Sequence, residues 1–193
     1  MDDEALIAGV IQHDARRAGE LHDRLISVIE STLVRLLGWG DDHDDLVQST
    51  FERIVETLMR GKFSRECSLK TWASSVAAHV ALNALRGRRR ARKVFDPIEV
   101  TEAAGNGAAG DAEQELRARD ELRAVQGHLS AMKPQHSMAL VLHDILGHDL
   151  AEIAEMLGIT VAAAQSRLVR GRREFLRRMG AVGAATEEGA EHA

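Results

Sequence analysis

The chain has 193 residues, enough for one medium-sized domain or two small ones, and its formal net charge is −5. Hydrophobic residues make up 45% of it and aromatic residues only 3%, so a core must be built from aliphatic side chains. Only two prolines interrupt long runs of Ala, Leu, Arg and Glu, and the sequence therefore predicts an all-α fold. The single cysteine, Cys67, excludes an internal disulfide and has no CxxC partner for a metal.

The start of the chain, MDDEALIAGV, is acidic where a secretory signal peptide would be basic. No apolar run approaches the length of a membrane span. We therefore expect a soluble protein of the reducing cytoplasm.

Charge is distributed unevenly along the chain. Residues 1–56 carry 13 acidic side chains against five arginines, whereas residues 86–93 contain six basic residues and no acidic one. Residues 167–178 contain six arginines and one glutamate. Two basic patches of this kind can bind phosphate, driven by the release of counterions, although the protein as a whole is acidic.

A change of composition separates the two basic patches. Residues 94–115 hold six acidic residues, three glycines and one proline but no lysine or arginine, which is typical of a flexible linker. The sequence thus predicts an N-terminal helical domain over 1–93 and a C-terminal helical domain over 116–179. The remaining residues, 180–193, are small and acidic, and we expect them to be disordered.

In the N-terminal domain, three segments have helical periodicity: 18–38, 41–61 and 68–93. None of these helices can bury an apolar stripe alone, so we expect them to pack together around one small core. The apolar side chains expected to face that core are Leu21, Leu25, Ile29, Leu33, Leu36, Leu37, Val47, Phe51, Ile54, Val55, Leu58, Trp72, Val76 and Val80, with Ala77 and Ala84 as further candidates.

In the C-terminal domain, Pro134 suits the start of a helix and Gly147 its end. Asp149 can cap the next helix, because Glu152 follows it at the spacing of a capping box. Gly158 can then supply a turn.

After that turn, Thr160 can cap a last helix over 161–179 whose two faces differ. The apolar face is expected to contain Val161, Ala164, Leu168, Gly171 and Phe175. The opposite, small and basic face is expected to contain Ala163, Ser166, Arg167 and Arg170. Such a helix fits the DNA major groove, and together with the preceding helix and turn it predicts a helix-turn-helix.

Three segments, taken in order, resemble a known family. DDHDDLVQSTFERIVETL is similar to the acidic DxEDLxQxxF helix of extracytoplasmic-function (ECF) sigma factors, the small bacterial transcription initiation factors of the sigma-70 family. LKTWASSVAAHVALNALRGRRR resembles the segment that follows it there. MKPQHSMALVLHDILGHDLAEIAEMLGITVAAAQSRLVRGRR resembles the C-terminal domain that reads promoters. The resemblance covers residues 15–93 and 115–178, and the order and spacing of the segments fit the family.

The resemblance implies a sigma factor that docks on core RNA polymerase and binds promoter DNA, with no cofactor, no metal and no catalytic residue. In the family, the acidic helix docks on a coiled coil of the largest polymerase subunit. Its polymerase-binding face is expected here to contain Asp44, Asp45, Leu46, Gln48, Ser49 and Glu52. Most of that face is polar and lies opposite the stripe that contains Phe51, as suits a charged partner helix.

The family's second segment opens the minus-ten promoter element and holds it as a single strand. The loop FSRECSLK lies where such proteins capture a flipped base, at a cost on the order of a few kcal/mol that a pocket and phosphate contacts must offset. The candidate phosphate contacts are Lys70, Arg86, Arg88, Arg89 and Arg90. Asn83 can either hydrogen-bond a base or occupy a polar helix face. Trp72 is expected in the core rather than as a platform on which a base stacks.

The C-terminal domain would read the minus-thirty-five element as duplex DNA. Its DNA contacts are expected to be Gln165, Ser166, Arg167 and Arg170, with Thr160 near a phosphate. The chain departs from the family at Ser137 and Gln165, where the family has basic residues, so this DNA-reading face carries less positive charge. We expect the departures to alter the promoter sequence that is read more than the fold.

Two other functions fit parts of the sequence. A helix-turn-helix regulator that never binds core polymerase would use the C-terminal domain but would have no use for the DDLVQ helix or the Trp72 segment. A metal-dependent enzyme is suggested by nine histidines and the DDHDD cluster. However, His143 and His148 are five residues apart, which is wrong for one helix face, and there is no HExxH motif. An anti-sigma partner is compatible with the sequence.

Overall fold

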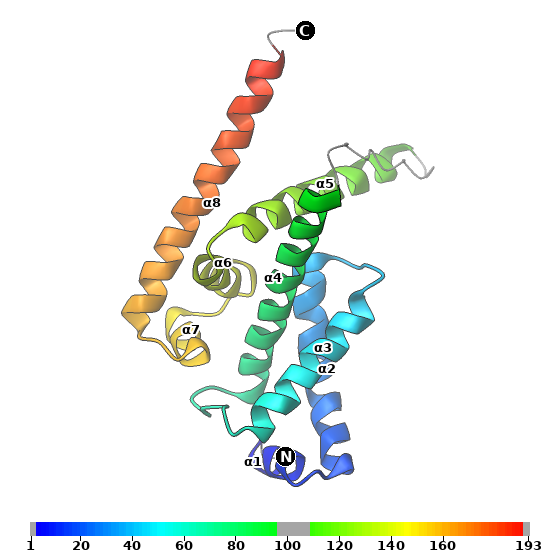
Figure 1. Ribbon diagram of the computed structural model, residues 1–193, viewed down its shortest axis with the longest axis vertical. Helices are drawn as coiled ribbons and strands as arrows, with labels where there is room; N and C mark the ends of the chain where they lie inside the picture. Colours follow the sequence, from blue (N-terminus) through cyan, green and yellow to red (C-terminus); the bar gives the residue numbers. More distant parts are fainter. Residues whose placement is uncertain (1–2, 96–108, 191–193) are drawn as a thin grey trace.

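The computed structural model describes residues 3–95 and 109–190. Its helices are α1 (Asp3–Ile11), α2 (Ala15–Leu37), α3 (His43–Met59), α4 (Leu69–Phe95), α5 (Ala109–Ala131), α6 (Pro134–Leu140), η1 (Val141–Ile145), α7 (Leu150–Leu157) and α8 (Val161–Ala190). The short π-helical segment η1 directly continues α6. The described residues contain no strand, and the predicted all-α fold is confirmed (Figure 1).

Helix α1 was not predicted from the sequence. It buries Leu6, Ile7 and Val10 and packs against α2 and α3. Because so short a helix is marginal in isolation, its stability comes from this tertiary packing. Asp14 then caps α2 by accepting a hydrogen bond from the backbone N–H of Arg16 at 2.9 Å.

The predicted apolar stripe of α2 is confirmed, because its side chains point into the core along the whole helix. The buried members are Leu21, Leu25, Ile29, Leu33 and Leu36. On α3, Ile54 and Leu58 are buried as predicted, whereas Val47, Phe51 and Val55 are half-buried at the edge of the core. Burial of a Leu or Ile side chain stabilises the fold by about 1.5–3 kcal/mol, so the α2 stripe is a large contribution.

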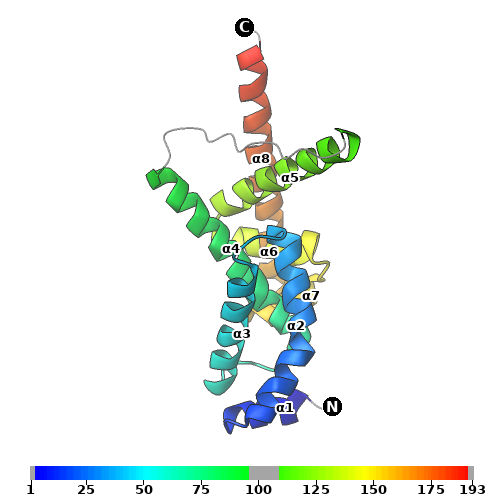
Figure 2. The same ribbon diagram turned by 90° about the vertical axis from the view of Figure 1, so that its right-hand side faces the viewer.

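Helix α4 lies between the two halves of the chain and packs against α2 and α3 on one side and α5, α6 and α7 on the other (Figures 1 and 2). The sequence predicted a single core face containing Trp72 and Val76, but both are only half-buried. A second face, rich in alanine and serine, is buried as well. The buried residues of α4 are Leu69, Ala73, Ser74, Ser75, Ala77, Ala78, Val80, Ala81, Leu82 and Leu85.

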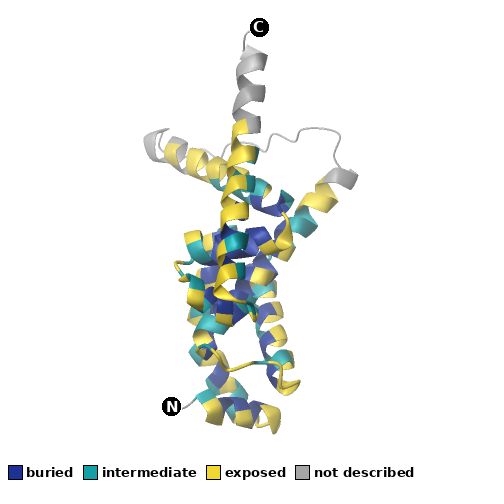
Figure 3. Cartoon of the chain, turned by 90° about the vertical axis from the view of Figure 1, so that its left-hand side faces the viewer, coloured by how far each residue is buried: buried dark blue, intermediate teal, exposed yellow. Residues whose placement is uncertain are grey.

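The two predicted domains share one continuous core, which appears as the dark blue residues in the middle of Figure 3. Polar contacts also join them. The side-chain amide of Gln126 on α5 donates a hydrogen bond to the carbonyl oxygen of Leu36 on α2 at 3.0 Å. Ser74 on α4 lies 3.0 Å from a ring nitrogen of His148, and Arg86 on α4 donates to Ser137 on α6 at 2.8 Å.

The predicted linker, 94–115, is shorter in the structure than in the prediction. Helix α4 continues to Phe95 and α5 begins at Ala109, so helix enters the predicted linker from both ends. Residues 96–108 lie outside the described residues. Likewise, α8 continues through Ala190, into the 180–193 segment that was expected to be disordered. This tail contains helix-favouring Ala and Glu and no proline. In the described part of the chain, no helix has the length and apolar character needed to cross a membrane.

Candidate nucleic-acid interface

The helix-turn-helix is formed by α7, the turn at Gly158 and α8. Asp149 caps α7 by accepting hydrogen bonds from the backbone N–H groups of Ala151 and Glu152, both at 2.8 Å. The Glu152 carboxylate accepts in return from the Asp149 N–H at 3.0 Å, which confirms the predicted capping box. Gly158 has φ +60°, a left-handed conformation that ends α7 and costs glycine no steric strain.

Helix α8 starts as the sequence predicted. The hydroxyl oxygen of Thr160 accepts from the backbone N–H of Ala163 at 3.2 Å. Ala164 and Leu168 are buried, whereas Val161, which was predicted on the same apolar face, is 48% exposed. Val161 occupies the first position of α8, where no neighbouring turn of its own helix covers it. The inward face therefore begins one turn later than predicted.

The crossing of α8 over α6 is tight at Gly171. A Cβ atom built there would lie 2.7 Å from the backbone oxygen of His136, so this position has no room for any side chain. Beside it, a ring nitrogen of His136 lies 2.8 Å from a carboxylate oxygen of Glu174, whose side chain is only 11% exposed. Arg178 donates to the same carboxylate at 3.1 Å. This buried pair fixes the position of α8 against α6.

The electrostatics of that pair favour a charged Glu174. Burial raises the pKa of Glu174, but hydrogen bonds from His136, from Arg178 and from the backbone of Lys133 together lower it more, so the pKa lies below its ordinary value. On the neighbouring turn, Arg172 donates to Asp144 of η1 at 2.5 and 2.9 Å, and this bond lowers the pKa of Asp144. The Arg172–Asp144 ion pair thus holds α8 against η1.

The outward face of α8 carries the side chains predicted to contact duplex DNA. Thr160, Gln165 and Arg170 are exposed, and Ser166 and Arg167 are half-buried. Three arginines of α8 spaced by three and four residues, together with Lys133 between α5 and α6, line a shallow depression of about 240 Å³. The basic residues of that depression are Lys133, Arg170, Arg173 and Arg177. Arg177 and Lys133 were not predicted as DNA contacts, although the 170–173–177 spacing indicated one helix face.

The predicted polymerase-binding face of α3 is largely open. Five of its six residues are exposed: Asp44, Asp45, Gln48, Ser49 and Glu52. Leu46 is half-buried and packs against the core, so only part of it is available to a partner. Gln48 donates to Glu52 at 2.8 Å, one turn further along the helix. The structure therefore places these side chains on one acidic surface.

The predicted phosphate contacts of α4 differ in whether they already bond other side chains of the protein. Lys70, Arg89 and Arg90 are exposed and make no hydrogen bond or ion pair with the described residues. By contrast, Arg88 donates to both carboxylate oxygens of Asp42, at 2.7 and 2.6 Å. One guanidinium nitrogen, Nη2, makes both contacts. This ion pair joins the residue before α3 to α4, so Arg88 is not free to bind a DNA phosphate.

Arg86 is held between the two halves of the chain. One of its nitrogens donates to the side-chain oxygen of the exposed Asn83 at 3.1 Å, and another donates to the hydroxyl of buried Ser137 at 2.8 Å. Burial, and then the positive charge of Arg90, lower the pKa of Arg86. Its Nε is buried without a partner, so this packing is not an optimal site for a guanidinium.

The aromatic side chain predicted in the core lies at its edge. Trp72 is half-buried, and its ring centroid is 4.8 Å from that of Phe63 in the loop between α3 and α4. That loop is the segment in which a flipped base was expected to bind. Among the described residues, no group of three or more His, Cys, Asp or Glu side chains is placed to hold a metal ion.

Comparisons with known proteins agree with this arrangement. A family model described as sigma-70 region 2 matches residues 21–91, and one described as sigma-70 region 4 matches residues 122–175. The chain is 27% identical over 181 residues to the ECF RNA polymerase sigma factor SigC of Mycobacterium tuberculosis, covering 91% of each chain. It is 29% identical over 143 residues to the RNA polymerase sigma factor CarQ of Myxococcus xanthus, covering 74% of this chain and 78% of that protein.

The fold is also found among solved structures. The structure of CnrH in complex with the cytosolic domain of CnrY matches with a TM-score of 0.53 and 23% identity, covering 93% of this chain and 97% of that one. A helix-turn-helix and two arginine-rich surfaces define a DNA-binding protein. Because both sigma-70 regions are matched in order and the relatives are ECF sigma factors, the chain belongs to the sigma-70 family as an ECF RNA polymerase sigma factor. Proteins of this family are in general initiation factors rather than enzymes.

Proposed function

We propose that this sigma factor docks on core RNA polymerase through the acidic surface of α3 and reads a promoter with two separate surfaces, one on α4 and one on α8. The observation that carries the proposal is the separation of charge. The exposed side chains of the first half of α3, residues 43–52, are acidic or polar, whereas α4 and α8 carry exposed arginines. A protein that only bound DNA would have no use for the acidic surface.

The α8 surface is suited to duplex DNA of the minus-thirty-five element. Gln165 and Arg170 are exposed, and Arg167 has part of its side chain available. Arginine can bond guanine, and glutamine adenine, through two hydrogen bonds each in the major groove. Arg173, Arg177 and Lys133 surround this surface and would contact phosphates, which position a protein but carry no sequence information.

The α4 surface is suited to the minus-ten element, with Lys70, Arg89 and Arg90 as free phosphate contacts and Asn83 as a polar contact to a base. Arg86 would join them after it leaves Ser137. Because that hydrogen bond links α4 to α6, full use of the α4 surface requires the two halves of the chain to separate. The acidic linker predicted over 94–115 would then connect two separate DNA-reading units.

The remaining features of the proposal follow from the family. The protein acts in the bacterial cytoplasm, where RNA polymerase and the chromosome are found, and it catalyses no reaction itself. The solved relative CnrH is bound to the cytosolic domain of CnrY. An anti-sigma protein is the corresponding partner for this chain, and it would hold the two units in an inactive arrangement.

Run-off transcription from a genomic promoter library, with core polymerase and with or without the protein, tests the proposal. We expect transcripts that depend on the protein and share two spaced promoter elements. Asp45→Lys should abolish them by placing a cation on the acidic surface of α3. Glu30→Lys, the same charge reversal at an exposed position of α2, should leave them intact. Duplex DNA binding without any transcript would instead indicate a regulator that does not use core polymerase.

A further inference from the structure

Trp39, in the short connection between α2 and α3, is the most exposed of the large hydrophobic side chains that the structure describes. Its exposed fraction is 77%, against 43–66% for the other exposed ones. The chain has only one other tryptophan, Trp72, which is half-buried. Because apolar stabilisation depends on the area removed from water, an indole ring left in water contributes little to the stability of the fold.

The protein holds this exposed ring in one place. The ring centroid of Trp39 lies 4.6 Å from that of His43, the first residue of α3. Backbone hydrogen bonds fix the connection on both sides of Trp39. The N–H of Gly38 donates to the carbonyl oxygen of Val34 at 2.8 Å, and that of His43 donates to Gly40 at 3.0 Å. A side chain that is already ordered loses less entropy when a partner binds it.

The contact between Trp39 and His43 leaves a polar atom of the free protein unsatisfied. His43 is only 7% exposed, and its Nε2 is buried without a hydrogen-bond partner among the described residues. Buried polar groups without a partner are rare in folded proteins because they cost stability. The stability of the free chain therefore does not explain why Trp39 is held against this ring.

The surroundings of Trp39 are acidic. Asp41, two residues further along the chain, is exposed, and the first turn of α3 carries the exposed residues Asp44 and Asp45. None of these three carboxylates makes an ion pair with another residue that the structure describes. A partner that covers Trp39 therefore meets an apolar ring beside uncompensated negative charge, and charge complementarity favours a basic partner surface.

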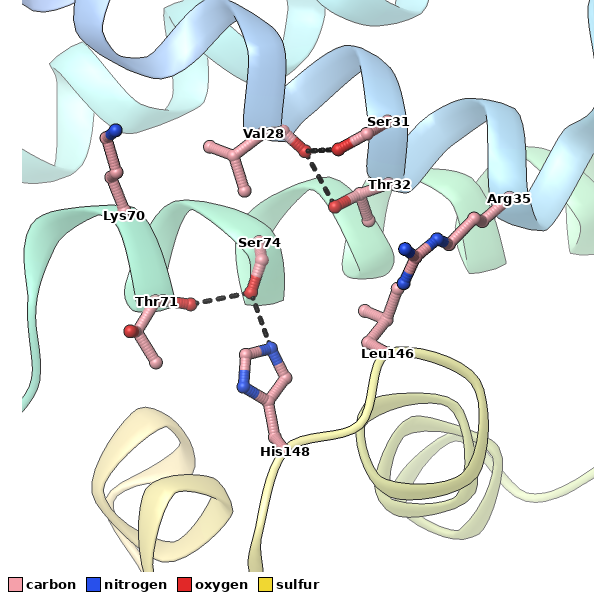
Figure 4. A pocket seen from close by; sticks show the side chains of 9 residues that line it. All are labelled: Val28, Ser31, Thr32, Arg35, Lys70, Thr71, Ser74, Leu146 and His148. Atoms are coloured by element: carbon pink, nitrogen blue, oxygen red, sulfur yellow. Dashed lines mark hydrogen bonds between the residues drawn. The ribbon is translucent and has the colours of Figure 1, made fainter.

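The polar pocket between the two halves does not offer a comparable surface. Its volume is about 230 Å³, and in Figure 4 the Arg35 and Lys70 side chains lie at opposite ends of it, so they do not converge on one ligand. Ser74 in its wall already lies 3.0 Å from Nε2 of His148. The pocket is therefore part of the contact between the halves.

We propose that Trp39 is the apolar anchor of the surface that docks on core RNA polymerase, where its ring enters a recess beside basic side chains. This inference rests on the proposed function, because it extends the acidic surface of α3 to the connection that precedes that helix. His43, which Trp39 contacts, is followed directly by Asp44 and Asp45, so one partner can cover the ring and the carboxylates together. Tryptophan is enriched among the residues that dominate binding energy, and cations pack well on its face.

The position of the connection suits this role. In Figure 1 it lies at the outer edge of the N-terminal half, on the side away from α7 and α8. A partner bound there leaves the outward face of α8 free for duplex DNA.

Titration of core RNA polymerase with the full chain tests the anchor. We expect Trp39→Ala to raise the Kd at least tenfold, and Trp39→Phe, which keeps an aromatic ring, to raise it less. Met59→Ala is the matched control, because Met59 is an exposed apolar residue at the other end of α3, and it should change the Kd less than twofold. Thermal unfolding of each variant establishes that it is folded.

A direct readout separates contact at the ring from an indirect effect on α3. In a chain with Trp72→Phe, Trp39 is the only tryptophan, and 5-hydroxytryptophan at this position can be excited at wavelengths that the tryptophans of the polymerase do not absorb. We expect acrylamide to quench its fluorescence strongly in the free chain and several-fold less in the complex with core polymerase. Promoter DNA alone should leave the quenching unchanged.

Two results would overturn the anchor and leave the proposed docking intact. In one, the ring stays accessible to acrylamide in the complex; in the other, Trp39→Ala binds as tightly as the original chain while Asp45→Lys does not. Protection that rises with the concentration of the chain alone would also overturn it, because the ring would then belong to a contact between two copies. Failure of the original chain to bind core polymerase would overturn the proposed function, and the anchor with it.

Discussion

Helices α4 and α8 are both rich in arginine, but their predicted DNA contacts differ in how far they are available to DNA. On α8, the side chains that are proposed to read DNA point outward, and the helix is fixed from behind by Gly171, by the His136–Glu174 pair and by Arg172 bonded to Asp144. On α4, Arg86 bonds Ser137 of the other half and Arg88 bonds Asp42. A basic sequence therefore does not by itself make an available surface, because neighbouring groups can already occupy it.

The close packing of α8 against α6 can be disrupted by a substitution at Gly171. Gly171→Ala places a Cβ atom against the backbone oxygen of His136, and backbone cannot move aside as a side chain can. Overpacking of this kind costs about 1–3 kcal/mol, so we expect a lower Tm and weaker binding to minus-thirty-five duplex. Gly127→Ala on α5 is the matched control, because its added Cβ meets nothing within 4 Å. Thermal unfolding and duplex titration measure both effects, and equal behaviour of the two variants would contradict the tight crossing.

The available surface of α8 can be tested without disturbing that support. Arg167→Ala should weaken binding to the minus-thirty-five duplex by about 1–3 kcal/mol and relax base preference at one position, if its guanidinium bonds a base. Arg177→Ala should weaken binding to all sequences similarly and lower the salt dependence, as expected for a phosphate contact. Titration against a set of single-base variants at two salt concentrations separates the two roles. A uniform loss for Arg167→Ala would remove it from the base contacts.

Arg86 of α4 can be freed from the C-terminal half by a substitution at Ser137. Ser137→Ala removes the acceptor of the Arg86 hydrogen bond, which is worth about 0.5–1.5 kcal/mol and up to roughly 3 for a charged donor. We expect minus-ten DNA to bind several-fold more tightly, since less energy is then needed to separate the halves. Ser130→Ala, at a buried serine whose hydroxyl bonds only within α5, is the control. Unchanged or weaker binding by Ser137→Ala would show that this contact does not restrain α4.

Acid should weaken the contacts that hold α8 against α6 and η1. The pKa values of Glu174 and Asp144 are lowered in the folded protein from ordinary values of 4.5 and 3.8, so the unfolded chain takes up protons before the folded one does. Their contribution to stability is complete above those values and is lost as the pH falls through the lower folded values. Thermal unfolding from pH 7 to pH 3 should show this loss, and Glu174→Gln should flatten it. Glu155→Gln, at an exposed position of α7, should not.

Much of the fold could be predicted from residues that lie close together in the sequence. The α2 stripe, the capping box at Asp149, the turn at Gly158 and the cap at Thr160 all depend on residues within one or two helical turns. Such interactions are encoded by short-range spacing and are therefore visible in a single sequence. The six positions predicted on the acidic face of α3 could be placed for the same reason.

Features that depend on distant segments were missed. The alanine-rich face of α4 has no amphipathic pattern, and it is buried only because α5, α6 and α7 cover it. The partners of Arg86 and Arg88, Ser137 and Asp42, are 51 and 46 residues away. Spacing along the chain cannot indicate that these cations are occupied. The helix α1 was missed because its short apolar segment is helical only in contact with α2 and α3.

The most direct test of the account is the distance between the two halves before and after promoter binding. Spin labels at Glu30→Cys on α2 and Ala151→Cys on α7, both exposed positions, can report it in a chain with Cys67→Ser. The account predicts one short distance in the free protein and a longer one in the complex with core polymerase and promoter DNA. The same short distance in both states would contradict it, because α4 would then have to read DNA while Arg86 remains bonded to Ser137 of the other half.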